Sequence, residues 1–164
     1  MRGLHRSAWP RCLRDDAVRK GWSTRLVRAL ARLVAARDLR ALLAPVRAAS
    51  KGDYPLTPTR EYAAWRRPDG APFDPWLRVH WRLGARVLAI TSRGNRVHAR
   101  IGEWEEWTGL RFPASGRYVV PGASQPIRVD RWRDRVHYEE ANVWMLHRLP
   151  KDGARRARQS GENA

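Results

Sequence analysis

The feature that most constrains the fold of this 164-residue chain is an amphipathic helix that leads directly into an apolar strand. The helix is predicted to begin at Gly21 and to end near Asp38, because apolar residues recur there every three to four positions. The segment that follows, 39–46 (LRALLAPV), is short and mostly apolar, as in a strand buried on both faces. A helix that feeds such a strand is half of a βαβ unit. The apolar face of the helix consists of Trp22, Leu26, Leu30, Leu33 and Val34.

Short helices and strands are predicted to alternate after residue 50. Asp74 with Pro75 is expected to N-cap one helix, and Thr57 with Pro58 an earlier one. Gly84 and Gly109 are expected to follow the ends of two helices. Strands follow, separated by glycine and proline turns. They are expected at 86–90, 97–99, 118–120, 127–129 and 142–147, with turns at 93–95 and 121–122 and a short helix at 102–108. The pattern as a whole predicts a mixed α/β (α+β) fold with short helices and a mixed sheet.

Composition excludes several kinds of site. Cys12 is the only cysteine, so neither an internal disulfide nor a cysteine-built zinc site is possible. The histidines have no metal-ligand spacing, and no metal is expected. No apolar run approaches the roughly 20 residues needed to span a bilayer, so we expect no membrane partner and a cytoplasmic location.

The formal net charge of +17 has two interpretations. Arginine supplies nearly all of it, since Lys20, Lys51 and Lys151 are the only lysines. Either a bias towards arginine spreads charge over the whole surface, or the charge attracts non-specific nucleic acid. The arginines follow no single stripe, which favours the first interpretation because specific nucleic-acid binding usually needs one. Tryptophans interleaved with arginines, as at 131–133, suit stacking on bases and keep the second interpretation open, although tryptophan is more often buried. Both interpretations stay open.

The start of the first helix is the clearest candidate for a binding site. Free backbone N–H groups and the positive end of the helix dipole bind phosphate at such a place. Gly21 lets the chain turn there, and the neighbouring residues supply charge and hydroxyl groups. The candidate cofactor-binding residues are Arg19, Lys20, Gly21, Trp22, Ser23 and Thr24.

Two other groups of residues carry side chains that catalysis uses. Tyr54 and Tyr62 follow the buried strand, where a phenol is able to act as a general acid. The acidic cluster Glu103, Glu105 and Glu106 offers a general base or a contact for a cation, although an exposed face is the more common fate of such a cluster. The sequence contains neither a GxSxG elbow nor a GxxxxGK[ST] phosphate loop.

The order of these parts resembles a known family. The basic-glycine turn, the helix, the strand 42–47 (LLAPVR) and the segment 54–58 (YPLTP) together resemble the later half of a GCN5-related N-acetyltransferase (GNAT) domain. Further segments are similar to the C-terminal region of bacterial GNAT-like proteins. They are 65–70 (WRRPDG), 73–80 (FDPWLRVH), 103–109 (EWEEWTG), 118–123 (YVVPGA) and 142–145 (NVWM).

The resemblance implies an acyl-CoA-dependent N-acyltransferase that moves an acetyl group from acetyl-CoA to an unknown amine. It implies that the turn at 19–24 holds the pyrophosphate of acetyl-CoA, and that Tyr62 or Tyr54 protonates the leaving thiolate. Because the family's first strands are not recognisable, we expect a truncated and inactive form. The expected divisions are 1–18, loosely ordered and foreign to the family; 19–149, the GNAT-like part; and 150–164, a disordered basic tail. The alternative is a basic, non-enzymatic nucleic-acid-binding or scaffold protein.

Overall fold

The computed structural model describes residues 21–149. The divisions predicted at 1–18 and 150–164 lie outside the described residues, as do Arg19 and Lys20. Within 21–149, no helix is long and apolar enough to cross a membrane. The helices are α2 (Trp22–Ala35), the 3-10 turn η1 (Lys51–Asp53), α3 (Thr59–Ala64), α4 (Pro75–Arg82) and α5 (Ile101–Thr108).

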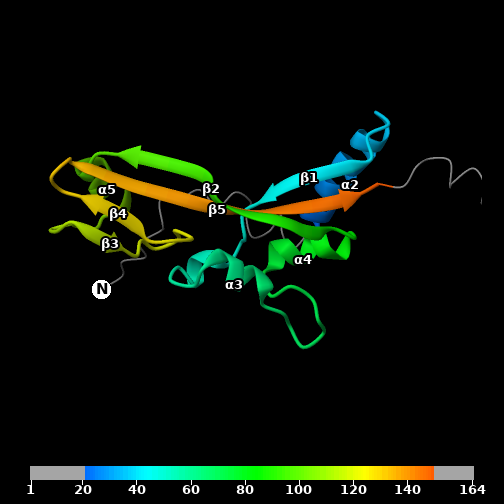
Figure 1. Cartoon of the computed structure of the whole chain (residues 1–164), viewed down its shortest axis with the longest axis horizontal. Coiled ribbons are helices and arrows are strands. Elements are labelled where there is room, and N and C mark those ends of the chain that lie inside the picture. The colour runs from blue at the N-terminus through cyan, green and yellow to red at the C-terminus, as the bar shows by residue number, and fades with distance from the viewer. Residues whose placement is uncertain (1–20, 150–164) are drawn as a thin grey trace, which may run out of the picture.

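One antiparallel sheet runs the length of the molecule, and its longest strands hold it together (Figure 1). The later part of β5 lies between β1 and β2, and its earlier part lies between β2 and β4. We call the end that contains β1 and the later part of β5 the β1 half, and the end that contains α5, β3, β4 and the earlier part of β5 the α5 half. The strands are β1 (Ala41–Val46), β2 (Arg86–Ala99), β3 (Gly116–Tyr118), β4 (Ile127–Asp130) and β5 (Arg135–Arg148).

This arrangement confirms the predicted mixed α/β class with short helices. All strand pairings between described residues are antiparallel, so the βαβ connection expected from α2 into β1 is not formed among them. The strand after α2 pairs instead with β5, with Val46 opposite Val143. The partner of this apolar strand lies almost a hundred residues away in sequence, and the local pattern predicted neither the partner nor the antiparallel direction.

Each half of the sheet has its own core. In the α5 half, Trp104 of α5 packs with Val129 and Val136 of the sheet, and all three are buried. In the β1 half, Leu77 of α4 packs with Val46 and Val143. Apolar burial of about 25 cal/mol per Å² therefore stabilises the two ends separately, and β2 and β5 join them.

The turn predicted at 93–95 is wrong. Strand β2 is continuous through these residues, and its pairing with β5 shifts register between Thr91 and Asn95. Gly94 is needed at this bulge because an added Cβ would stand 2.9 Å from the Glu140 carbonyl oxygen and even closer to the Asn142 side chain. A glycine that resembles a turn signal in sequence here permits a close backbone approach.

The predicted helix caps have mixed outcomes. Asp74 N-caps α4, and its side chain accepts from the Trp76 and Leu77 N–H groups. Gly84 follows α4 with a φ of +81° and Gly109 ends α5 in the left-handed region, as predicted. The predicted Thr57 cap is wrong, since α3 begins at Thr59 without a side-chain cap.

Candidate functional site

The start of α2 has an open helix terminus. Gly21 is the N-cap residue with a φ of +71°, and a glycine has no side chain that could cap the first turn. The first turn also contains no acidic residue. An α-helix leaves its first backbone N–H groups without intrahelical partners. The amides of Trp22, Ser23 and Thr24 thus lie at a helix start whose N-cap residue is a left-handed glycine, and such helix starts suit an anion.

The side chains of this turn differ in exposure. Ser23 is buried, whereas Trp22 is about half exposed (53%). The guanidinium carbon of Arg25 lies 5.6 Å from the centre of the Trp22 ring, within the range of a cation–π contact. The turn is therefore basic on its exposed side even within the described residues.

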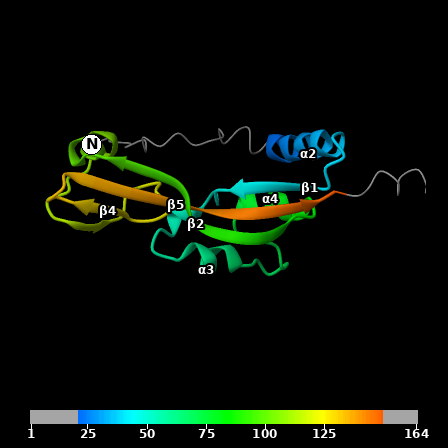
Figure 2. The same cartoon turned by 45° about the horizontal axis from the view of Figure 1, so that its top comes forward.

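The start of α2 and the end of β1 lie at the same end of their pair, towards the middle of the molecule (Figures 1 and 2). Figure 2 shows α2 running beside β1, on the side away from α3. Tyr54 and Tyr62 follow β1 through η1 and α3. The fold thus brings the candidate phosphate turn and the strand that leads to the tyrosines together.

Tyr62 occupies a fully buried position with a structural partner. Its hydroxyl donates to Asp74 Oδ2 at 3.0 Å. Burial, with the charge of Asp74 and the hydrogen bond to it, raises the pKa of Tyr62 well above its usual value. A phenol in this state is a poor proton donor, and its hydrogen bond explains its burial.

Tyr54 is the more accessible of the two tyrosines, with 37% of its side-chain surface exposed. Its ring contacts Tyr62, Trp65 and Phe73, with ring centres 5.7, 4.9 and 5.8 Å away respectively. The contacts with Trp65 and Phe73 are edge-on, and the three rings together hold the Tyr54 ring in one orientation while leaving part of it accessible. Of the two candidate tyrosines, Tyr54 is thus the one that solvent reaches.

Sequence reasoning missed a buried polar cluster where the two halves of the sheet meet. Glu140 Oε1 accepts from Arg47 Nε and from the Tyr138 hydroxyl, each at 2.6 Å, and from Ser124 Oγ at 3.2 Å. Arg47 directly follows β1, so the cluster ties the end of β1 to β5 and to the 121–125 turn. Tyr138 and Glu140 are two residues apart on one strand and therefore share a face, and this spacing is the one sign of the cluster in the sequence. It does not identify Arg47 and Ser124, which are distant in sequence, as the partners.

Lys51 is a second unpredicted buried polar group in this region. Its Nζ donates to the carbonyl oxygens of Tyr54 and Ser124, both at 2.7 Å, and faces the Tyr62 ring. Burial lowers its pKa. The lysine therefore fixes the loop that carries Tyr54 against the 121–125 turn.

The acidic cluster on α5 lies mostly at the surface, as its exposed-face interpretation expects, and two of its glutamates stabilise local structure. Glu103 accepts from the Arg100 N–H and completes the helix cap. Glu105 accepts from the Phe112 N–H at 3.0 Å and from Arg111 at 2.7 Å. These two contacts hold the pKa of Glu105 below its usual value.

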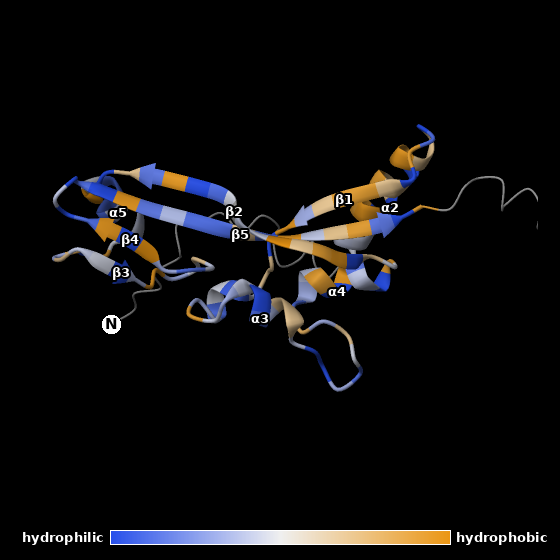
Figure 3. Ribbon diagram, viewed as in Figure 1, coloured by the Kyte–Doolittle hydropathy of each residue, from blue (hydrophilic) through white to orange (hydrophobic). Residues whose placement is uncertain are grey.

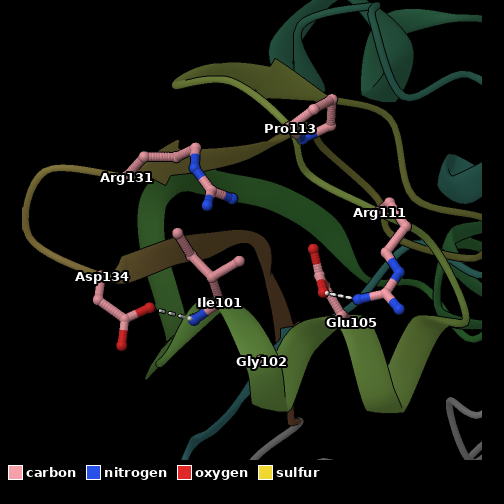
Figure 4. Close-up of a pocket in the computed structure, with 7 residues that line it drawn as sticks. All are labelled: Ile101, Gly102, Glu105, Arg111, Pro113, Arg131 and Asp134. Atoms are coloured by element: carbon pink, nitrogen blue, oxygen red, sulfur yellow. Dashed lines mark hydrogen bonds and ion pairs between the residues drawn. The ribbon is translucent and has the colours of Figure 1, made fainter.

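An open cavity of about 640 Å³ lies beside α5 (Figure 4). Figure 4 shows Ile101 and Glu105 of the helix facing Arg131 from the β4–β5 connection. Its polar groups are already engaged, since Asp134 accepts from the Ile101 N–H and Arg131 donates to the Phe112 carbonyl. The cavity is at the far end of the sheet from the start of α2 (Figure 1).

The four histidines of the described part of the chain form two pairs. His80 Nδ1 and His147 Nε2 are 2.9 Å apart and buried, and burial lowers both pKa values, that of His80 to about 4. His98 and His137 face each other on the exposed side of the sheet, with Nδ1 atoms 2.7 Å apart. Among residues 21–149, no group of three or more histidine, cysteine, aspartate or glutamate side chains is placed to hold a metal.

The outer surface of the β1 half is unusually apolar. Most of the predicted apolar face of α2 is exposed, with Val34 partly buried, and the residues that the helix buries are Ser23 and Val27. Strand β1 pairs with β5 along one edge, and no described strand pairs with its other edge. Figure 3 shows the apolar colour along α2 and β1. The exposed side chains are Trp22, Leu26, Leu30 and Leu33 of α2, with Leu39 and Leu43.

Comparison with known proteins gives one informative match. The chain is 32% identical over 125 residues to an arginine N-acetyltransferase of Aspergillus versicolor, covering 65% of this chain and 43% of the relative. The chain spans less than half the length of this curated relative. No protein-family model matches it, and no solved structure does.

Proposed function

We propose that this chain forms part of an acyl-CoA-dependent N-acetyltransferase with a GNAT-like fold. The observation that carries the proposal is the 32% identity to an arginine N-acetyltransferase. The mixed α/β architecture is compatible with part of such a fold. On this proposal the acceptor is an amine, and arginine is the first candidate.

In the proposed complex, the start of α2 holds the pyrophosphate of acetyl-CoA. The amides of Gly21, Ser23 and Thr24 belong to the start of this helix, and Arg19 and Lys20 add positive charge next to it in sequence. The absence of any acidic side chain in the first turn favours an anion there.

The proposed reaction is direct attack of the amine on the thioester carbonyl. A C–N bond forms, the C–S bond breaks, the amine loses a proton and the thiolate gains one. Geometry and hydrogen bonds to the thioester oxygen would supply most of the rate enhancement. We propose that Tyr54 donates the proton that the leaving thiolate gains, because Tyr62 is buried and already donates to Asp74.

The proposal includes a further polypeptide segment against the β1 half. Among residues 21–149, the outer edge of β1 has no partner strand, and together with the exposed apolar side chains of α2 it forms a surface that monomeric proteins rarely leave uncovered. Because the relative is more than twice as long as the matched part, the rest of its length is a suitable source for this segment.

A chimera tests the proposed function. The chain would replace the matching 125 residues of the Aspergillus versicolor enzyme, and mass spectrometry would measure acetylated arginine formed from acetyl-CoA. We expect acetylation, and a fall of about tenfold or more for Tyr54→Phe, as for loss of a general acid. Tyr62→Phe should change the rate less than it changes stability. A folded chimera that fails to acetylate any amine, while the parent enzyme does so, would refute the proposal.

A further inference from the structure

The strand register places four basic side chains in one row across the α5 half of the sheet. Arg117 of β3 is opposite Arg128 of β4, Arg128 is opposite His137 of β5, and His137 is opposite His98 of β2. Directly opposed residues project from the same face, with Cβ atoms about 5 Å apart. We call these four residues the basic row.

The basic row stands on the open face of the sheet. Residues alternate between the two faces of a strand, and the neighbours Val129 and Val136 are buried against Trp104 of α5. Arg117, Arg128 and His98 are exposed. Figure 3 shows hydrophilic colour along this part of β5, in contrast to the β1 half.

The arginines of the row have no compensating partners. Among residues 21–149, neither Arg117 nor Arg128 makes a side-chain hydrogen bond or ion pair, although they stand directly opposite each other. Nearby acids are engaged elsewhere, because Asp130 binds Arg133 and Glu139 binds Arg96. Like charges in opposed positions destabilise a sheet, so an anion lying across the strands would relieve the repulsion.

An exposed tryptophan lies at the end of the same strands. Trp132, in the turn between β4 and β5, is 95% exposed, the most of the exposed large apolar side chains. Arg131 and Arg133 flank it in sequence. A ring that packs on almost nothing contributes little to the core, and its two faces are free to stack on another flat group.

We propose that this face binds single-stranded nucleic acid, with phosphates on the basic row and a base stacked on Trp132. The combination of a cationic track and a projecting aromatic ring is what sequence-tolerant single-strand binding requires. An anionic membrane is less well matched, because Trp132 is the one large apolar side chain of the β4–β5 turn. The face is remote from the start of α2 (Figure 1), so this inference is independent of the proposed acetyltransferase function.

Fluorescence anisotropy with a labelled 20-nucleotide poly(dT) and the full chain tests the electrostatic part. The Arg117→Gln/Arg128→Gln variant should bind about tenfold more weakly at 0.1 M salt. Its plot of log affinity against log salt should be shallower by about 1.4, since each single-strand phosphate contact contributes about 0.7. The matched control Arg28→Gln/Arg32→Gln removes the same charge from exposed positions on α2 and should change affinity less than twofold.

Trp132 provides the second arm of the test. Trp132→Leu should weaken binding by about fivefold or more without changing the salt slope, whereas Trp132→Phe should retain most of the affinity. Unchanged thermal transitions would establish that the variants are folded. Equal losses in the two arginine variants, or tighter binding to phosphatidylserine vesicles than to poly(dT), would overturn the proposal.

Discussion

Replacing Asp74 by alanine is expected to destabilise the protein by about 4 kcal/mol. The carboxylate is buried and accepts four hydrogen bonds from three segments. Oδ1 accepts from the Trp76 and Leu77 N–H groups, and Oδ2 accepts from the Ser50 N–H and the Tyr62 hydroxyl. An N-cap contributes about 1 kcal/mol, and each of the other two bonds to a charged acceptor contributes about 1.5 kcal/mol or more.

Urea denaturation followed by circular dichroism would measure this loss. Asp69→Ala is the matched control, because Asp69 is exposed and accepts only from the Ala71 N–H, beside a weak contact with Arg67. That control should cost about 1 kcal/mol or less. A loss below 1 kcal/mol in Asp74→Ala would refute the reasoning that this carboxylate joins α3, α4 and the loop after β1.

Three further predictions concern other parts of the fold. Burial lowers the pKa of His80 to about 4, below the unfolded value of about 6.5. The folded state therefore binds fewer protons than the unfolded state between these pH values. The free energy of unfolding should fall by about 3 kcal/mol as the pH drops from above 6.5 to 4. Urea titrations should find a flatter pH profile for His80→Gln, and an equally steep one would contradict this. Gly94→Ala should cost about 1–3 kcal/mol, because its Cβ would press on the Glu140 carbonyl; a thermal transition equal to that of the parent would show that the bulge yields freely. Leu33→Gln should change the stability of the isolated chain by less than about 0.5 kcal/mol, since Leu33 is half exposed, yet it should lower acetylation by the chimera, and equal activity would argue against a covering segment on α2.

Sequence patterns predicted what depends on neighbours in the chain. The α2 periodicity, the Asp74 cap and the glycines that end α4 and α5 are all local, because the groups that interact lie within a few residues. Position 94 was misread for the same reason. Gly94 is required because residues of β5, which are far away in sequence, lie too close to its backbone for a side chain to fit.

The polar contacts around Glu140 were beyond prediction because the residues that make them are distant in sequence. Arg47 and Glu140 are separated by 93 residues, and neither has a sequence neighbour that indicates the pairing. The face of α2 that packs inward was also not predictable from periodicity alone. Within the described residues, the helix buries Ser23 and Val27 and leaves most of its apolar face exposed. Which face a helix buries depends on the elements that pack against it.

Binding of acetyl-CoA to two variants at Gly21 tests the central claim most directly. Asparagine and aspartate both tolerate the left-handed conformation of this N-cap and have nearly the same shape. They differ by one negative charge at the proposed pyrophosphate position. In calorimetric titrations of the chimera, Gly21→Asn should keep its affinity for acetyl-CoA within a few-fold, whereas Gly21→Asp should lose about tenfold or more. Equal affinities in the two variants would contradict the assignment of the α2 start as the acyl-CoA site.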